Sequence, residues 1–318
     1  MADLTLLLPA LERFGGQALG RDAAKALGRA DAGHAGSGRR AQLQRQVRLP
    51  AGRWPIAALS RQSEVGDAEG WAWLRAEPAW LQPDINGVRL MAYGPALEPT
   101  EADVAALLPT LQPLFGDAGF ALDAPTPARW YVRAPAGTRL PTFPDPADVV
   151  GDDLFEFDDR EDSAEARRWR LLSSESQILL HNLPWNQQRA AHGKAPINAL
   201  WFWGGGVLPM PGAAIVSSHT AIHSDDPTLQ ALAASVGVAN PLDEAMSPAH
   251  AAGSVLVDLA HDTDLRRIEE AWLQPAIDAL RNGALHRLTL DAEDGRCWHF
   301  TRGQRWRFWR QPRLRLSQ

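Results

Sequence analysis

The chain lacks the features that mark several special classes of protein. Its 318 residues include a single cysteine, Cys297, so no disulfide can form within the chain and a reducing compartment is expected. No apolar run has the length of a membrane span, and the opening MADLTLLLPALERF has neither the basic segment nor the small-residue cleavage site of a secretory signal. We therefore predict a cytoplasmic protein without a membrane partner.

Common catalytic and nucleotide-binding motifs are also missing. There is no GxSxG elbow of a serine hydrolase. The triplet Gly204-Gly205-Gly206 has Pro209 where the last glycine of a dinucleotide loop would stand, and Gly193-Lys194 precedes Ala195 instead of Ser or Thr. These departures exclude a Rossmann loop and a Walker phosphate loop.

Composition is that of an ordinary globular protein. The chain is 45% hydrophobic and 22% charged, and its length suits one or two domains. The net charge of -6 argues against a surface that binds nucleic acid or anionic lipid as a whole. The segment from Asp145 to Glu165 contains ten carboxylates and a single arginine, Arg160. We interpret this stretch as a solvated linker.

The C-terminal end has the opposite charge. From Arg296 onward the chain has seven arginines and no acidic residue, and arginines alternate with aromatic residues over Arg296–Phe300 and Arg305–Trp309. Alternation of this kind predicts a hairpin near Arg302–Gln304, with one buried aromatic face and one solvated arginine face. The alternative is a stacking platform for single-stranded nucleic acid, which we consider the weaker hypothesis.

Hydrophobic patterning predicts an α/β fold. Asp226 followed by Pro227 is typical of a helix start, and Gly283 of a helix end. A capping pattern at Thr100 starts another helix, which Pro109 and Pro113 should shorten or kink. Strands are predicted at residues 4–8, 129–132, 197–203, 213–216, 254–259 and 285–290, and helices at 100–115, 162–183, 226–236 and 264–282. Such alternation favours a mostly parallel sheet flanked by helices.

One segment, residues 175–212, concentrates polar groups around a predicted strand. His181, Asn186 and Arg189 precede the strand, and Gly204, Gly205 and Gly206 follow it. Glycines at a strand end let a ligand approach backbone N–H groups, and an arginine fork suits a phosphate or a carboxylate. The alternative is purely structural, because Trp201–Trp203 can fill the core and glycines can simply turn the chain.

The same segment carries a resemblance. HNLPWNQQRAAHGKAPINALWFWGGG resembles the central motif of archaeal-type cofactor-independent phosphoglycerate mutases and, more closely, that of the RpfE-type bacterial regulatory protein family. The resemblance covers about residues 71–290. It implies an alkaline-phosphatase-superfamily core, residues 1–64 and 151–318, and a smaller inserted α+β domain at 65–150. It also adds Arg129 to the residues of a possible anion pocket.

Departures from the mutase pattern concern its two metal ions and its serine nucleophile. Those enzymes place an Asp-Gly directly after the first strand, where this chain has Leu8-Pro9-Ala10. None of these three side chains supplies the oxygen ligand that a divalent cation needs. Ser37 is the only plausible remnant of the nucleophile.

A partial ligand set predicts little phosphoryl transfer. We therefore expect a catalytically degenerate, mutase-like protein without a metal cofactor, which acts by regulation or by binding a small phosphorylated or carboxylate ligand. A regulatory protein partner is possible. The alternative is an active mutase or phosphatase that binds manganese or zinc through Asp258, His261, Asp262 and Asp291.

Overall fold

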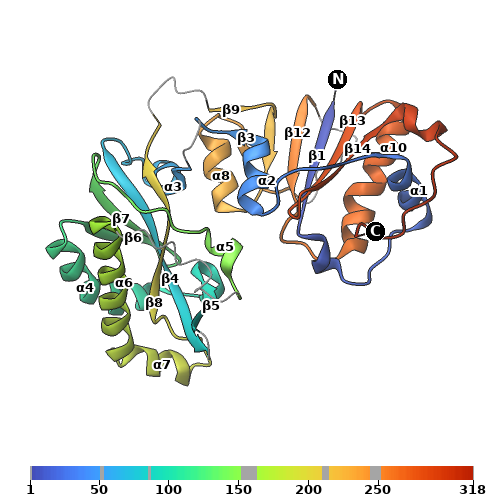
Figure 1. The fold of residues 1–318 in the computed structure, drawn as a ribbon. Coiled ribbons are helices and arrows are strands. Elements are labelled where there is room, and N and C mark those ends of the chain that lie inside the picture. The colour runs from blue at the N-terminus through green and yellow to red at the C-terminus, as the bar shows by residue number, and fades with distance from the viewer. Residues whose placement is uncertain are drawn as a thin grey trace. The chain divides into compact units, whose positions relative to one another are not determined.

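The computed structural model describes residues 2–50, 54–84, 87–151, 163–209, 215–243 and 252–317. The chain forms two compact units, which are described separately (Figure 1). The terminal unit contains Met1–Pro50 and Ala214–Gln318, and the central unit contains Ala51–Ala213. The central unit includes α3 (Ile56–Glu64) and β8 (Ala199–Val207), which both contact its long strand β4 (Trp71–Asp84).

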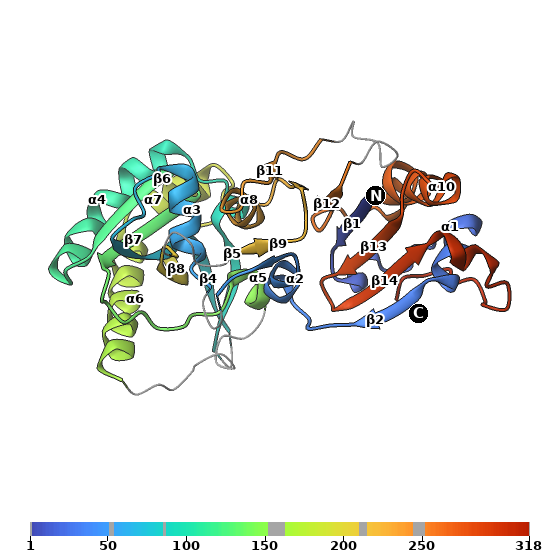
Figure 2. The same cartoon turned by 90° about the horizontal axis from the view of Figure 1, so that it is seen from above.

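The terminal unit contains a seven-stranded sheet in the order β11-β10-β12-β1-β13-β14-β2 (Figure 2). The pairs β11-β10, β10-β12, β12-β1 and β1-β13 are parallel, whereas β14 runs antiparallel to both β13 and β2. The strands are β1 (Asp3–Leu8), β2 (Asp31–His34), β10 (Ala221–His223), β11 (Ala239–Asn240), β12 (Ser254–Asp258), β13 (Arg287–Ala292) and β14 (Arg296–Thr301). The predicted mixed α/β fold with a largely parallel sheet is thus confirmed for this unit.

The helices of this unit are η1 (Leu11–Phe14), α1 (Arg21–Arg29), α2 (Arg39–Gln46), α8 (Pro227–Ala234), α9 (Leu265–Ile268), η5 (Glu269–Leu273), α10 (Gln274–Asn282) and η6 (Arg302–Trp306). The predicted helix over 264–282 is continuous from α9 to α10, with one π-helical segment, η5, in its middle. Pro275 explains the irregularity, since a proline within a helix has no N–H to donate. A small ladder, β3 (Val47–Arg48) with β9 (Val216–Ser217), completes the unit.

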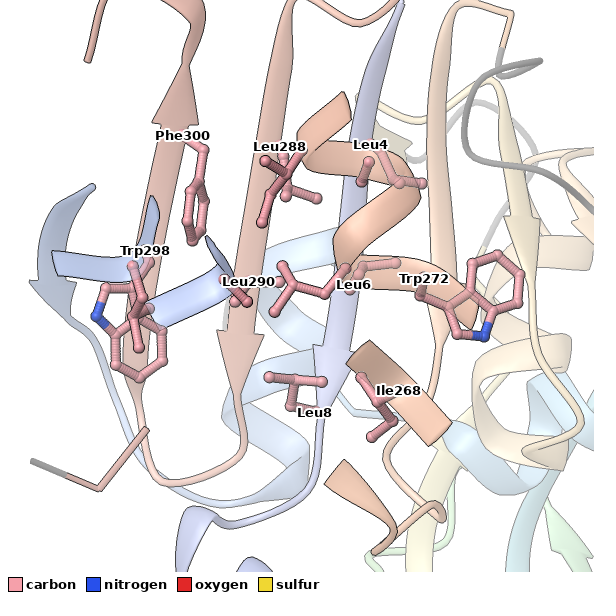
Figure 3. Packing of buried hydrophobic residues seen from close by; sticks show 14 of the residues in the cluster. Leu4, Leu6, Leu8, Ile268, Trp272, Leu288, Leu290, Trp298 and Phe300 are labelled. Atoms are coloured by element: carbon pink, nitrogen blue, oxygen red, sulfur yellow. The ribbon is translucent and has the colours of Figure 1, made fainter. Parts of the chain in front are cut away.

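One face of the sheet packs against α1, α9, η5 and α10. Leu4, Leu6 and Leu8 point from β1 toward this face, and Ile268 and Trp272 approach them from the helices (Figure 3). Alternate residues of a strand point to the same face, so the leucine-rich β1 can bury its other side chains on the opposite face. Leu7 is fully buried there, which explains why the strand has apolar residues on both faces.

The central unit has an antiparallel sheet. The long strand β4 (Trp71–Asp84) pairs with β8 (Ala199–Val207), with β7 (Arg129–Pro135) and with β5 (Gly87–Tyr93), and β7 pairs with β6 (Ala121–Thr126). The strand predicted at 197–203 is therefore β8, and it lies in this antiparallel sheet rather than in the parallel one.

The helices of the central unit are α3 (Ile56–Glu64), η2 (Gly94–Leu97), α4 (Glu101–Asp117), α5 (Pro146–Val149), α6 (Ala164–Asn182) and α7 (Trp185–Ala191). Thr100 and Asp103 form the predicted capping box of α4, but the helix continues through Pro109 and Pro113. The expected shortening was wrong, because the packing of Leu107, Leu111 and Phe115 sustains the helix. Most of the acidic stretch, residues 152–162, lies outside the described residues.

The predicted C-terminal hairpin was wrong. Trp298 and Phe300 are buried on β14 as expected, but β14 pairs with β13 and β2. After Thr301 the chain turns into η6, because Thr301 and Gln304 form a capping box. Within the described ranges, no helix combines the length and the apolarity needed to cross a membrane.

Candidate functional site

The C-terminal ends of the parallel strands are where open α/β sheets place their ligands. Asp258 ends β12 and Asp291 lies near the end of β13, and both are paired in register with Leu7 of β1. Neighbouring strands lie about 4.8 Å apart, so the backbones at the two aspartates are about 10 Å apart. The central strand, ending in Leu8-Pro9, supplies no carboxylate between them.

Helix α2 brings an arginine to one of these aspartates. Arg39 Nη2 lies 2.6 Å from Asp258 Oδ2 and 2.8 Å from Asp226 Oδ2. The Ser224 hydroxyl also donates to Asp258 Oδ2, at 2.7 Å. Burial opposes ionisation of Asp226, but Arg39 outweighs it and lowers the pKa of that carboxyl below its usual value. Arg39 thus supplies the positive charge between two buried carboxylates.

The same helix brings a second arginine to the other aspartate. Arg45 grips Asp291 with two contacts, Nη2 to Oδ1 at 2.7 Å and Nε to Oδ2 at 3.0 Å. Gln46 adds a third contact, donating to Asp291 Oδ2 at 2.7 Å. Gln42 donates to the main-chain carbonyls of Leu8 and Asp291, at 3.0 and 2.7 Å. We call these four side chains of α2, Arg39, Gln42, Arg45 and Gln46, the α2 clamp.

The clamp bears on whether these residues suit a divalent cation. Such an ion requires several oxygen or imidazole ligands directed at one point. In the described part of the chain, no group of three or more His, Cys, Asp or Glu side chains is arranged to hold a metal. The Asp258 and Asp291 side chains instead contact separate guanidinium groups, on the two sides of β1. The donor set in this geometry therefore does not fit a metal.

The other residues of the alternative metal set have different neighbours. Asp262 pairs with Arg267 at 2.8 Å. His261 has a side chain that is 75% exposed, and its Nε2 lies 4.0 Å from Asp226. The structure does not gather these two residues with Asp258 and Asp291 around one point.

Histidines nearer the strand ends have other partners. His219 is buried, and its ring nitrogens contact Ser254 Oγ at 3.1 Å and Gln46 Oε1 at 3.0 Å. Burial lowers the pKa of His219 to about 4. His223 Nδ1 is 3.1 Å from the carbonyl oxygen of Pro241, its hydrogen-bond acceptor. Both histidines thus have structural partners.

Ser37, the expected remnant of a nucleophile, is exposed in the loop before α2. It is two residues from Arg39 in sequence, so it stands at the start of the helix that carries the clamp. Sequence analysis found Ser37 but missed the clamp. The missed signal is the spacing of Arg39, Gln42, Leu43 and Gln46, four residues that share one helix face and are all buried.

In the central unit, the predicted anion-binding residues form a brace. Arg189 on α7 is only 3% exposed. Its Nε donates to the carbonyl of Ala195 at 2.9 Å, Nη2 donates to that of Leu97 at 2.7 Å, and Nη1 pairs with Asp103 at 2.8 Å. We call this the α7 brace.

Asn186 extends the brace. Its amide donates to the carbonyls of Leu180 and Ile197, both at 3.0 Å, and accepts from the Ile197 N–H at 2.9 Å. His181, at the end of α6, is exposed. Asn186 and Arg189, both on α7, thus bind the segment that follows the helix, whereas His181 lies at the surface.

Asp103 is the acidic member of the brace. Burial raises its pKa, but hydrogen bonds from Trp185, Arg189 and Thr100 outweigh burial and lower the pKa of Asp103 to about 2. The carboxylate therefore stays ionised at neutral pH and ties the start of α4 to α7.

The remaining predicted residues also have chain partners. Gly204, Gly205 and Gly206 lie within β8 rather than after it. A side chain at Gly206 would approach the Cβ of Pro55 to 2.7 Å, and one at Gly204 would meet Ile56 at 3.2 Å. The glycines therefore allow the start of α3 to pack closely on the strand. Arg129, on β7, pairs with Glu64 of α3.

A sequence comparison found a relative among curated proteins. The chain is 29% identical over 158 residues to a Geobacter sulfurreducens protein named as a probable 2,3-bisphosphoglycerate-independent phosphoglycerate mutase. The match covers 50% of this chain and 38% of that protein. The chain thus matches less than half the length of this relative.

Comparison with solved structures gave distant likenesses. A Pyrococcus horikoshii protein superposes with a TM-score of 0.48 and 10% identity, over 94% of this chain and 87% of that one. A cofactor-independent phosphoglycerate mutase from Thermoplasma acidophilum gives a TM-score of 0.41 and 16% identity, over 95% and 90% of the two chains. No protein-family model matches the sequence. What the comparisons establish is a distant relationship in sequence, over half of this chain, to a cofactor-independent phosphoglycerate mutase.

Proposed function

We propose that the chain is a phosphoglycerate-mutase-like protein that has lost phosphoryl transfer and acts by binding, as a bacterial regulatory protein of the RpfE type. In this proposal the terminal unit descends from the alkaline-phosphatase-like core and the central unit from its inserted domain. The α2 clamp is the observation that carries the proposal.

Phosphoryl transfer on a two-metal site needs cations that polarise the moving group and activate the nucleophile. Arg39 and Arg45 neutralise the aspartates at the strand ends without offering an open coordination position. A guanidinium group stays protonated at neutral pH, so it neither releases a proton nor activates a serine or a water molecule. The charges that would hold cations in an enzyme thus stabilise the fold in this protein.

The binding role has two possible forms, a regulatory protein partner or a small phosphorylated or carboxylate ligand. The second form requires donors beyond those of the α7 brace, because the Arg189 and Asn186 side chains already bond to the chain. The brace therefore argues against an anion held by these two residues.

Continued activity is the rival function, supported by the sequence relationship to a mutase. It would need Arg39 and Arg45 to leave Asp258 and Asp291, so that manganese or zinc could replace them. Ser37, exposed at the start of α2, would then be the nucleophile.

An assay of phosphoglycerate interconversion separates the two functions. The purified full chain is supplied in turn with Mn²⁺, Zn²⁺ and Mg²⁺, and the 2- and 3-phosphoglycerates are quantified. We expect no turnover above that of buffer. Turnover that Ser37→Ala abolishes, while the exposed control Ser174→Ala leaves it unchanged, would establish the rival function.

A further inference from the structure

The C-terminal segment presents aromatic rings to solvent. Trp306, Phe308 and Trp309 are 62%, 74% and 69% exposed. Trp298 and Phe300, a few residues earlier, are buried in the core of the terminal unit. Three exposed rings within four residues form an apolar surface of the kind that marks an interaction site. We call Trp306–Trp309 the aromatic loop.

The chain on both sides of the aromatic loop is anchored. Before the loop, Gln304 donates to Asp31 Oδ2 at 2.9 Å, and Arg29 donates to the carbonyl of Arg305 at 2.8 Å. After the loop, the N–H of Arg313 donates to the carbonyl of Ala24 on α1, at 2.9 Å. Figure 2 shows this tail beside α1. The rings are therefore held on a fixed support, which lowers the entropy cost of binding.

The charge around the loop is positive and mostly unpaired. Arg307 pairs with Asp31. Five other arginines between residues 302 and 315 form no ion pair with a described residue: Arg302, Arg305, Arg310, Arg313 and Arg315. The guanidinium of Arg305 lies 4.9 Å from the centroid of the Trp306 ring. A partner of this surface must therefore be anionic and must also offer flat apolar groups.

We propose that the aromatic loop and its flanking arginines bind single-stranded nucleic acid. Each nucleotide carries a base that can stack on a ring and a phosphate that can pair with an arginine, so its repeat matches the alternation of rings and arginines here. The hairpin interpretation expected the aromatic residues of this segment to be buried. Because Trp306, Phe308 and Trp309 are exposed, that interpretation does not account for them. We expect binding to depend little on base sequence, because every base has a face that can stack.

Fluorescence anisotropy tests the proposal with the full chain and labelled oligo(dT) and oligo(U) of about 20 nucleotides. Replacing all three rings, Trp306→Ala with Phe308→Ala and Trp309→Ala, should weaken binding at least about tenfold, since stacking contributes a factor of about ten per base. The control replaces two exposed apolar residues of α6, Leu171→Ser with Ile178→Ser, and should leave affinity unchanged. Far-UV circular dichroism checks that each variant is folded.

A second variant tests the charges and stays informative if the ring variant does not fold. Arg305→Gln with Arg310→Gln should reduce the slope of log affinity against log salt by about 1.4, at about 0.7 for each phosphate contact. Arg266→Gln with Arg281→Gln, two exposed arginines that have acidic partners, is the control.

Four results would overturn the proposal. The first is an absence of binding at about 50 mM salt. The second is binding that neither variant changes. The third is binding of anionic phospholipid vesicles, but of no oligonucleotide, that the ring variant abolishes. The fourth is self-association of the chain that the ring variant abolishes without any oligonucleotide binding.

Discussion

The α2 clamp and the α7 brace both bury arginines that look functional, but they use them differently. In the clamp, Arg39 stands between two carboxylates, and Arg45 grips a third. In the brace, Arg189 meets one carboxylate and two main-chain carbonyls. The clamp therefore balances charges that would otherwise repel each other at the strand ends, whereas the brace mainly satisfies the polar groups of a loop.

The two regions also differ in the sequence separation of their partners. In the brace, Arg189 contacts Ala195, six residues along the chain and within one recognisable motif, and also contacts Asp103 and Leu97, the latter 92 residues away. Arg39 and Asp258 are 219 residues apart. A motif search thus finds Asn186 and Arg189, whereas the clamp and the contacts of Arg189 with Leu97 and Asp103 are visible only when the chain is folded.

The largest expected effect is the loss of Arg39. Arg39→Ala leaves Asp226 and Asp258 buried without their cation, so we expect the free energy of unfolding to fall by about 5 kcal/mol. Urea unfolding followed by circular dichroism measures the change. Arg266→Ala, which removes an exposed arginine paired with Glu270, should leave the free energy of unfolding close to that of the unaltered chain. Equal small losses in both variants would show that the clamp does not stabilise the fold.

A smaller loss is expected in the brace. Arg189→Ala leaves Asp103 with its bonds from Trp185 and Thr100, so the free energy of unfolding should fall by about 3 kcal/mol. Combining Arg189→Ala with Asp103→Asn should cost less than the sum of the two single changes, because the variants share one interaction. Strict additivity in this double-mutant cycle would contradict direct coupling of the two side chains.

The third prediction concerns the pH dependence of stability. It compares His219, which lies beside the clamp, with Asp103 of the brace. His219, which contacts Gln46 of the clamp, has a folded pKa of about 4 against an ordinary value of 6.5. Below pH 6.5 the His219 side chain is protonated in the unfolded chain but stays neutral in the folded chain. The free energy of unfolding therefore falls as the pH falls from 6.5 toward 4. The loss from this group is about 3 kcal/mol.

Chemical unfolding at several pH values measures this contribution. His219→Gln should reduce the fall in stability between pH 6.5 and pH 4, and the exposed control Ser174→Ala should not. Asp103 behaves differently, since its pKa is lowered to about 2 and its contribution is lost only below the ordinary value of 3.8. A pH profile for His219→Gln that matches that of the unaltered chain would refute the buried, neutral state of His219.

Local patterns in the sequence were enough to predict several elements. The apolar run of β1, the capping box at Thr100 and the Asp226-Pro227 start of α8 each follow from residues close together in the chain. The clamp could not be predicted this way, because it depends on which strands lie beside β1. The place of β8 in the central sheet depends likewise on its pairing with β4.

The glycine triplet shows the same limit. Its three residues are equally suited to a ligand loop and to a crowded strand, and the sequence does not say which partner lies opposite. In the structure, Pro55 and Ile56 pack against β8 at Gly206 and Gly204. The prediction of a C-terminal hairpin was wrong for a related reason. The alternation of arginines and aromatic residues predicted a second strand with a buried aromatic face, but the capping box at Thr301 starts a helical turn there.

The central claim is that guanidinium groups, rather than metal ions, balance the carboxylates at the strand ends. Calorimetric titration of Mn²⁺ into the chelator-treated full chain tests it most directly. Our account predicts no saturable binding in the micromolar range. Two tightly bound equivalents of Mn²⁺, lost when Asp258 or Asp291 is replaced by asparagine, would contradict it.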